Sequence, residues 1–192
     1  MRRTAVIRAV AGALVIVLGA WGAQASLMFN HTITGAVLDL SEAPEDGRDT
    51  QAVKTFLQTG TNLYNENPSC LPAGAELYLT ACSGCHGLVA EGKLGPGLND
   101  NYWTYPKNTT DKGLFETIFG GAQGQMGPMY GALTLDEMLL SMAWVRHLYT
   151  GDPSEATWLT AEQRSDFTPY AGDHQIHTDA AVTESECNPV PE

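Results

Sequence analysis

The sequence predicts a mainly α-helical fold in which short helices are joined by long loops. Two four-residue patterns, Thr134 with Glu137 and Thr160 with Gln163, have the form of a capping box, in which side chains satisfy the free backbone N–H groups of a helix start. After Thr134 the apolar residues recur at helical spacing, and the stretches between such segments are rich in Gly, Asn and Pro. We find no internal repeat. These observations indicate a single α-helical domain.

The first 25 residues have the pattern of a secretory signal. Arg2, Arg3 and Arg8 flank an apolar stretch at 9–21, and a small-residue sequence, Ala-Gln-Ala, ends at Ala25. The apolar run is shorter than the roughly 20 residues that a membrane-spanning helix needs, which disfavours the alternative of an uncleaved anchor. We therefore predict cleavage after Ala25, export to the periplasm and no membrane anchor in the processed chain.

The chain is strongly acidic. It has 22 Asp and Glu residues against 10 Lys and Arg, which gives a formal net charge of −12. The predicted signal contains three of the basic residues and no acidic one, so its removal changes the charge to −15. This balance argues against nucleic acid and anionic membranes as partners. It favours a basic protein partner, and it fits equally well a surface that charge simply keeps soluble.

Composition divides the remaining chain into three parts, namely an N-terminal arm (26–69), a central block (70–150) and a C-terminal extension (151–192). In the arm, residues 32–39 are predicted to be extended. Residues 49–58 are predicted to form a helix with Asp49 as its N-cap and Gly60 just beyond its end. After residue 171 the extension becomes polar and acidic, a composition typical of disorder.

The central block is predicted to contain three helices. The first spans about 74–81, and the second spans 112–119 with Asp111 as its N-cap. The third begins at the capping box of Thr134, continues to Tyr149 and is ended by a glycine and a proline.

The chemistry is carried by the sequence Cys82-Ser-Gly-Cys85-His86, which follows the first of these helices directly. Cys-x-x-Cys-His is the attachment signature of c-type haem, in which both thiols add to the haem vinyl groups and the adjacent imidazole binds the iron. The same cysteine spacing serves redox-active dithiols and zinc sites. Those sites need a βαβ setting or a second pair of ligands, and the sequence offers neither. We predict one covalent haem c, attached through Cys82 and Cys85, with His86 as an axial iron ligand.

Two cysteines remain, Cys70 and Cys187. Spare cysteines of one small exported domain usually pair in an oxidising compartment, so we predict a disulfide that tethers the C-terminal extension to the central block. His174 and His177 have the spacing of a weak metal pair, but in an acidic tail they are better interpreted as solvated side chains.

The central block resembles class I cytochromes c in the haem motif, in Gly95-Pro96 and in the string GLFETI at 113–118. A longer set of strings is similar to a narrower family, cytochrome c-L. These strings are EGKLGPGLND at 91–100, YWTYP at 102–106, GQMGPM at 124–129, DTQAVK at 49–54 and WVRHLYTGDP at 144–153. The resemblance covers about residues 34–170 and implies a class I cytochrome c core of short helices around one haem.

The resemblance also implies roles for several residues around the haem. The second axial ligand is expected to be a methionine, a soft ligand that raises the reduction potential. Its spacing before Leu133 favours Met126, with Met129 as the alternative. The carbonyl of Pro96 is expected to accept a hydrogen bond from the imidazole of the iron ligand. The aromatic residues that follow, chiefly Tyr102 and Trp103, are candidates for binding the haem propionates.

The family further implies an electron carrier, which is not an enzyme. It would accept single electrons from quinoprotein methanol dehydrogenase, which uses pyrroloquinoline quinone, and pass them to another class I cytochrome c. It also implies a calcium ion near a haem propionate. Two alternatives remain open, a general periplasmic shuttle for another dehydrogenase and a haem peroxidase or sensor with a displaceable sixth ligand.

Overall fold

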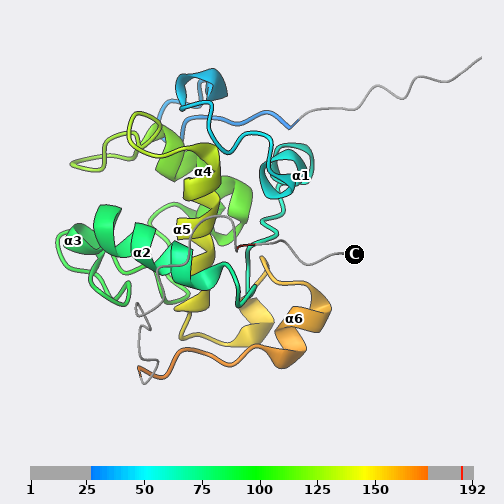
Figure 1. Cartoon of the computed structure of the whole chain (residues 1–192). Coiled ribbons are helices and arrows are strands. Elements are labelled where there is room, and N and C mark those ends of the chain that lie inside the picture. Colours follow the sequence, from blue (N-terminus) through cyan, green and yellow to red (C-terminus); the bar gives the residue numbers. More distant parts are fainter. Residues whose placement is uncertain (1–26, 173–186, 188–192) are drawn as a thin grey trace, which may run out of the picture.

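The computed structural model describes residues 27–172 and Cys187, and these form a helical body with long connecting loops (Figure 1). The predicted signal segment, the histidine pair and most of the tail lie outside the described residues. The six α-helices of the described part are α1 (Gln51–Thr59), α2 (Leu71–Ala81), α3 (Ser83–His86), α4 (Asp111–Gly120), α5 (Leu135–His147) and α6 (Ala161–Asp166). Of three 3-10 helices in the described part, η1 (Leu40–Glu42) precedes α1, η2 (Pro106–Thr109) precedes α4 and η3 (Pro153–Glu155) precedes α6. None of the described helices is long and apolar enough to span a membrane.

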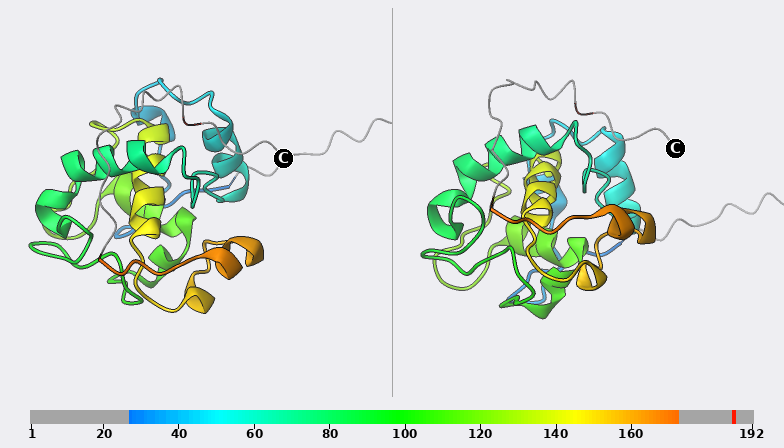
Figure 2. Two further views of the ribbon diagram at one scale, coloured as in Figure 1. Left: turned by 60° about the horizontal axis from the view of Figure 1, so that its bottom comes forward. Right: turned by 90° about the horizontal axis from the view of Figure 1, so that it is seen from below.

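Helix α5 is the central element of the core, and α2 crosses it at close range in both views of Figure 2. The crossing is close because Gly74 of α2 lies against the backbone of α5. A Cβ atom at position 74 would come within 2.3 Å of the carbonyl oxygen of Leu140. Because α2 runs directly into the Cys-x-x-Cys-His turn, this contact fixes where that turn sits relative to α5.

Replacing Gly74 by Ala is therefore expected to lower the free energy of unfolding by about 1–2 kcal/mol, because overpacking at a helix crossing outweighs the gain in helix propensity. Urea unfolding of the haem-loaded protein measures the effect. Gly131→Ala is the matched control, since a Cβ atom there meets nothing within 4 Å, and it should stay within about 0.5 kcal/mol of the parent. Equal stability of both variants would show that the crossing tolerates a methyl group.

The N-terminal arm is part of the core. Phe29 of the arm packs on Phe56 of α1 and Phe115 of α4, with ring centroids 5.7 Å and 5.3 Å away. The backbone N–H of Asn30 donates to the buried carboxylate of Glu116 at 2.8 Å. Burial opposes the ionisation of Glu116, but Lys107, a second lysine and this N–H together hold its pKa below the ordinary value. The arm is thus anchored to α4 by both apolar and charged contacts.

The C-terminal extension folds back on the end of α5 and forms a second, smaller apolar cluster. Its members are Tyr149, Ala156, Trp158, Leu159 and Phe167. The capping box of Thr160 and Gln163 begins α6 as predicted, and that of Thr134 and Glu137 begins α5.

The structure joins Cys70 and Cys187 in a disulfide, which confirms the predicted pairing. Cys70 is completely buried at the start of α2, in the main core. The bridge therefore fixes position 187, near the end of the chain, to the helix that leads into the haem motif.

Several local predictions were wrong in detail. The N-cap of α1 is Thr50 and not Asp49, since its hydroxyl accepts the N–H of Val53 at 3.2 Å. The N-cap of α4 is Thr110, and Asp111 is the first helical residue, with its side chain turned to a tertiary partner.

Two other segments also differ from the prediction. Helix α2 begins at Leu71, three residues earlier than expected, because Pro72 occupies its first turn, where the missing N–H costs no hydrogen bond. The segment 32–39 is a turn at 32–34 followed by irregular chain, and within the described residues its extended character is limited to one isolated bridge between Asn30 and Val37.

Candidate functional site

The Cys-x-x-Cys-His motif faces a cavity of about 510 Å³ between α2, α4, α5 and two long loops. The cavity brings together predicted site residues from distant parts of the sequence, and its wall is mostly apolar. The predicted residues that line it are Cys82, Cys85, His86, Pro96, Trp103, Met126 and Met129.

The backbone of the motif folds as one helical turn. Cys82 ends α2, with its N–H bonded to the carbonyl of Tyr78, and its own carbonyl accepts the N–H groups of Cys85 and His86 at 3.1 Å and 3.0 Å. The thiol of Cys82 is half-buried and that of Cys85 is exposed. Burial, together with the neighbouring Cys85, raises the pKa of Cys82 to about 11. The turn thus presents two thiols and one imidazole to the same cavity, which is the arrangement that covalent haem attachment requires.

His86 is held in one orientation. Its side chain is buried, and its Nδ1 lies 2.8 Å from the carbonyl oxygen of Pro96. Because a carbonyl oxygen only accepts, Nδ1 carries the proton and Nε2 keeps the lone pair that a metal needs. A Cβ atom on the adjacent Gly95 would come within 2.7 Å of the imidazole Cε1, so a glycine is required there for the ring to fit.

Met126 and Met129 lie on the loop that follows α4, and both line the cavity. The backbone N–H of Met129 bonds to carbonyls at the end of α4, while the carbonyl of Met126 accepts the N–H of Ala122 at 2.9 Å. Gly121 has φ of +81°, and a Cβ atom there would approach the backbone of the 126–128 segment to 2.8 Å. The loop is therefore folded tightly back on itself with both thioethers available to the cavity.

The aromatic residues after Pro96 separate into two groups. Trp103 is buried and lines the cavity, as does Tyr105, whose hydroxyl accepts the N–H of Gln123 at 3.1 Å. Tyr102 is 71% exposed and is not among the residues of the cavity wall. The structure thus brings Trp103 to the haem motif but not Tyr102, because the two side chains leave the chain in different directions.

Among the polar residues of the cavity wall that the sequence analysis missed, three lie on helices. Asn108, Thr117 and Ser141 lie on η2, α4 and α5. The hydroxyl of Thr117 donates to the Asn108 side-chain oxygen at 2.8 Å, and that of Ser141 donates to the carbonyl of the residue three before it. Serine and threonine inside apolar helical stretches were the only available signal.

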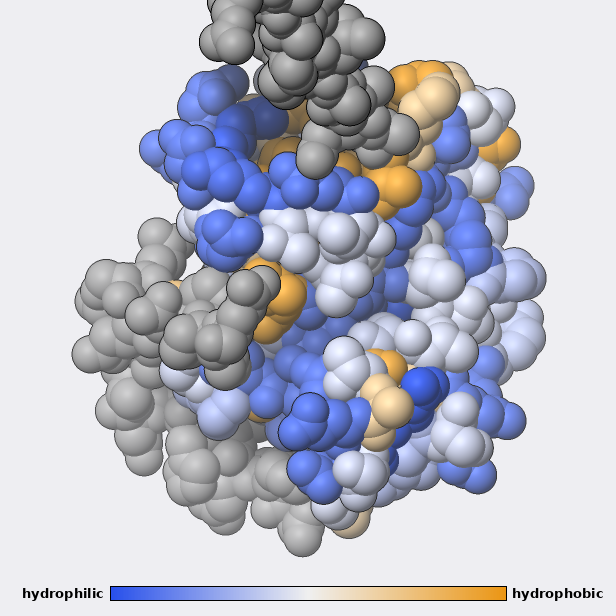
Figure 3. Space-filling view, turned by 90° about the vertical axis from the view of Figure 1, so that its right-hand side faces the viewer, coloured by the Kyte–Doolittle hydropathy of each residue, from blue (hydrophilic) through white to orange (hydrophobic). Residues whose placement is uncertain are grey.

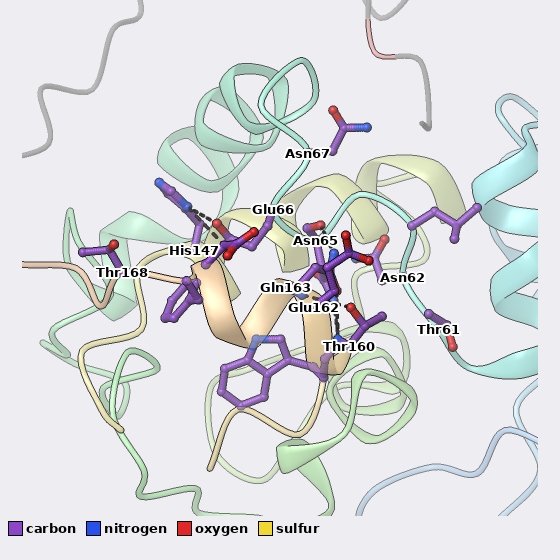
Figure 4. A pocket seen from close by; sticks show the side chains of 14 residues that line it. Thr61, Asn62, Asn65, Glu66, Asn67, His147, Thr160, Glu162, Gln163 and Thr168 are labelled. Atoms are coloured by element: carbon purple, nitrogen blue, oxygen red, sulfur yellow. Dashed lines mark hydrogen bonds and ion pairs between the residues drawn. The ribbon is translucent and has the colours of Figure 1, made fainter. Parts of the chain in front are cut away.

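A second cavity, of about 640 Å³, lies between the 61–67 segment and α6, and Figure 4 shows its wall. No residue of the haem motif lines it. Its wall is polar, and on it the imidazole Nδ1 of His147 lies 3.1 Å from the carboxylate of Glu66. The lack of convergent cysteines or methionines among its lining residues separates it from the haem site.

Comparison with known proteins gives the family. Residues 69–145 match the family described as cytochrome C oxidase, cbb3-type, subunit III. The chain is 57% identical over 171 residues to cytochrome c-L of Methylorubrum extorquens, which covers 89% of this chain and 85% of that protein. The chain belongs to the cytochrome c-L family. It is accordingly a c-type cytochrome with a class I-like core, an electron-transfer protein and not an enzyme.

Solved cytochromes of the same family have the same fold. The crystal structure of cytochrome cL from Hyphomicrobium denitrificans is 58% identical and superposes with a TM-score of 0.71, covering 76% of this chain and 88% of that one. Cytochrome CL from the marine methylotrophic bacterium Methylophaga aminisulfidivorans is 58% identical with a TM-score of 0.72, covering 75% and 95%. The helical core described above is therefore the family's core.

Proposed function

We propose that this cytochrome is a periplasmic electron carrier that accepts single electrons from a methanol dehydrogenase dependent on pyrroloquinoline quinone and passes them to another cytochrome c. One observation carries the proposal, the 57% identity to a cytochrome c-L over most of the chain. The cavity that joins the Cys-x-x-Cys-His turn to a methionine loop supports it chemically. The predicted signal at 1–25 supports the periplasmic location.

The residues of the cavity have separate tasks in this proposal. A bound haem c supplies a one-electron iron couple. Cys82 and Cys85 would hold the group by thioether bonds, and Nε2 of His86 would bind its iron. Pro96 fixes the imidazole by accepting the Nδ1 proton, which also raises the basicity of the ring.

Met126 is proposed as the second axial ligand. Its neighbours are glycines on both sides of the Gln-Met pair, so its side chain projects from a loop and not from a packed helix. Met129 is the alternative. Both backbone groups of Met129 make hydrogen bonds, since its N–H donates to carbonyls of α4 and its carbonyl accepts the N–H groups of Ala132 and Leu133. The backbone hydrogen bond of Met126, from Ala122, stays within the loop, whereas those of Met129 reach α4 and the segment before α5.

A methionine in the sixth position favours a carrier over a peroxidase or a sensor. Those functions need an open or displaceable sixth site, whereas both methionines of the loop line this cavity. A general shuttle for another dehydrogenase fits the site equally well, and only the similarity to cytochrome c-L argues against it.

The haem propionates and a calcium ion near them also need partners in this proposal. We propose that Trp103 and Tyr105 bond a propionate, since both line the cavity. The family resemblance implies a calcium ion near a propionate. Within residues 27–172 and Cys187, however, no group of three or more His, Cys, Asp and Glu side chains is placed to hold a metal ion, and we assign it no ligands.

The acidic charge of the chain suggests how the partner is recognised. The described face in Figure 3 is mostly hydrophilic, with only small hydrophobic patches. With 22 acidic residues in the sequence, such a surface favours docking to a basic partner by long-range attraction.

Electron transfer from the dehydrogenase is therefore expected to slow as salt is added, because exposed charges are screened over about 8 Å at physiological ionic strength. Stopped-flow reduction by methanol-reduced dehydrogenase, from low salt upward in sodium chloride, measures the rate constant. We expect a fall of about tenfold or more in the second-order rate constant. A rate that is flat across ionic strength would remove the electrostatic part of the proposal.

A further inference from the structure

Arg146 of α5 is an unusual core residue. It is the largest of the fully buried side chains among the described residues, with 1% of its surface exposed. Arginine is almost never fully buried unless it is paired. Its neighbour in sequence, Val145, lines the haem cavity. A permanent positive charge therefore lies directly behind the wall of the site.

The partner of Arg146 is Asp111, the first residue of α4. The arginine Nε donates to the Asp111 carboxylate at 3.0 Å, and both side chains are at most 3% exposed. Burial raises the pKa of the carboxyl group, while the guanidinium and the helix N-terminus favour its charged form. Arginine stays protonated in proteins, and both carboxylate oxygens of Asp111 accept hydrogen bonds, from Arg146 and Asn65, which favours the ionised carboxylate and hence a buried ion pair.

The two charges of this ion pair contact different parts of the protein. Arg146 donates from Nη2 to the carbonyl of Asn108 at 2.9 Å, and its guanidinium lies 5.1 Å from the ring centroid of Trp103. Asn108 and Trp103 both line the haem cavity. Asp111 also accepts a hydrogen bond, at 2.7 Å, from Asn65, which lines the second cavity (Figure 4). The cation thus contacts two residues of the haem-cavity wall and, through Trp158, the wall of the second cavity, whereas the anion contacts only the second of these walls.

Little else neutralises the arginine on the haem side. Its Nη1 atom is buried and has no hydrogen-bond partner among the described residues. The other face of the guanidinium is covered by the indole of Trp158, with 4.1 Å to the ring centroid. The guanidinium is thus buried between two aromatic rings and away from water, so its charge acts at low local dielectric.

We infer that Arg146 is a positioning residue that orders Trp103 and Asn108 on the cavity wall and raises the reduction potential of the haem through the oriented pair with Asp111. The inference rests on the proposed haem site at His86. Uptake of one electron leaves the cavity with one more negative charge. A cation nearer the cavity than its counter-ion stabilises that charge more than the counter-ion opposes it.

Redox titration of the haem-loaded variants tests this inference, because the two charges are expected to shift the reduction potential in opposite directions. Asp111→Asn removes the anion and, because an amide has a single acceptor oxygen, keeps only one of the hydrogen bonds that the carboxylate accepts from Asn65 and Arg146. It should raise the equilibrium constant for reduction by about tenfold, which is 59 mV for one electron. Arg146→Gln should lower it by at least a similar factor while Asp111 stays ionised, and by less if Asp111 then takes up a proton, because the opposing anion is then lost as well. Arg146→Lys keeps the charge and should stay closer to the parent than Arg146→Gln does.

Asp136→Asn is the matched control. Asp136 lies at the opposite end of α5, where it accepts hydrogen bonds from Thr50 and Tyr64, neither of which lines the haem cavity. Its replacement should shift the potential much less than Asp111→Asn. Chemical denaturation of each variant separates any loss of stability from the shift in potential.

Shifts of the same sign for Asp111→Asn and Arg146→Gln, or no shift in either, would overturn the inference and leave a purely structural pair. If Arg146→Gln does not fold, a potential for Asp111→Asn at or below the parent value overturns it alone. Failure of the proposed haem site has a different signature, since the parent protein would then show no covalent haem and no reversible couple to titrate.

Discussion

Replacing Met126 by Ala is expected to abolish the methionine-to-iron charge-transfer band of the oxidised protein and to lower the reduction potential. The thioether stabilises ferrous iron, so its loss should reduce the equilibrium constant for reduction more than tenfold, or more than 59 mV for one electron. The emptied position should also bind carbon monoxide in the reduced state. Absorption spectroscopy and a redox titration measure all three changes.

Met129→Ala is the matched control, because Met129 is three residues away on the same loop and also lines the cavity. It should keep the band and a potential close to that of the parent. The reverse pattern, in which the band survives in Met126→Ala and disappears in Met129→Ala, would transfer the ligand assignment to Met129. Rapid carbon monoxide binding by the unchanged protein would instead favour the sensor or peroxidase alternative.

Removal of the disulfide by the double change Cys70→Ala and Cys187→Ala is expected to lower the free energy of unfolding by about 4–5 kcal/mol. The bridge closes a loop with a sequence separation of 117, and the chain-entropy estimate for a loop of this size has that magnitude. Because Cys70 is completely buried, alanine avoids placing a new polar group in the core. Urea unfolding of the haem-loaded protein gives the difference.

Reduction of the parent protein provides the comparison for this variant. A mild thiol reductant should bring the unfolding midpoint of the parent close to that of the double variant, while the double variant should not respond. The haem should remain attached in both, since Cys82 and Cys85 are separate from the bridge. An unchanged midpoint in the double variant would show that the tether contributes nothing to stability.

The sequence predicted the parts of the fold that depend on neighbouring residues. The capping boxes at Thr134 and Thr160 were confirmed because both partners lie within one helical turn. The haem motif was recognisable because Cys82, Cys85 and His86 lie within five positions of one another. The carbonyl oxygen of Pro96 lies 2.8 Å from Nδ1 of His86, a contact that the resemblance implied. The pairing of Cys70 with Cys187 followed from elimination, since only two cysteines remained.

Contacts between distant segments could not be predicted in this way. Asp111 looked like an N-cap because it precedes a helical stretch, but the structure uses its carboxylate to hold Arg146, 35 residues away. Tyr102 and Trp103 are neighbours in sequence, and only the packing of the loop shows that one faces the cavity and the other solvent. Tertiary burial thus overrides local pattern at each of these positions.

The most direct test of the proposed function is to mix the purified, oxidised cytochrome with a methanol dehydrogenase that depends on pyrroloquinoline quinone and to add methanol. The haem is expected to become reduced with two equivalents of cytochrome per methanol oxidised, since each haem accepts one electron and the alcohol gives two. A control without methanol should show no reduction. A haem that stays oxidised in the complete mixture, while a chemical reductant reduces it readily, would contradict the assignment of methanol dehydrogenase as the electron donor.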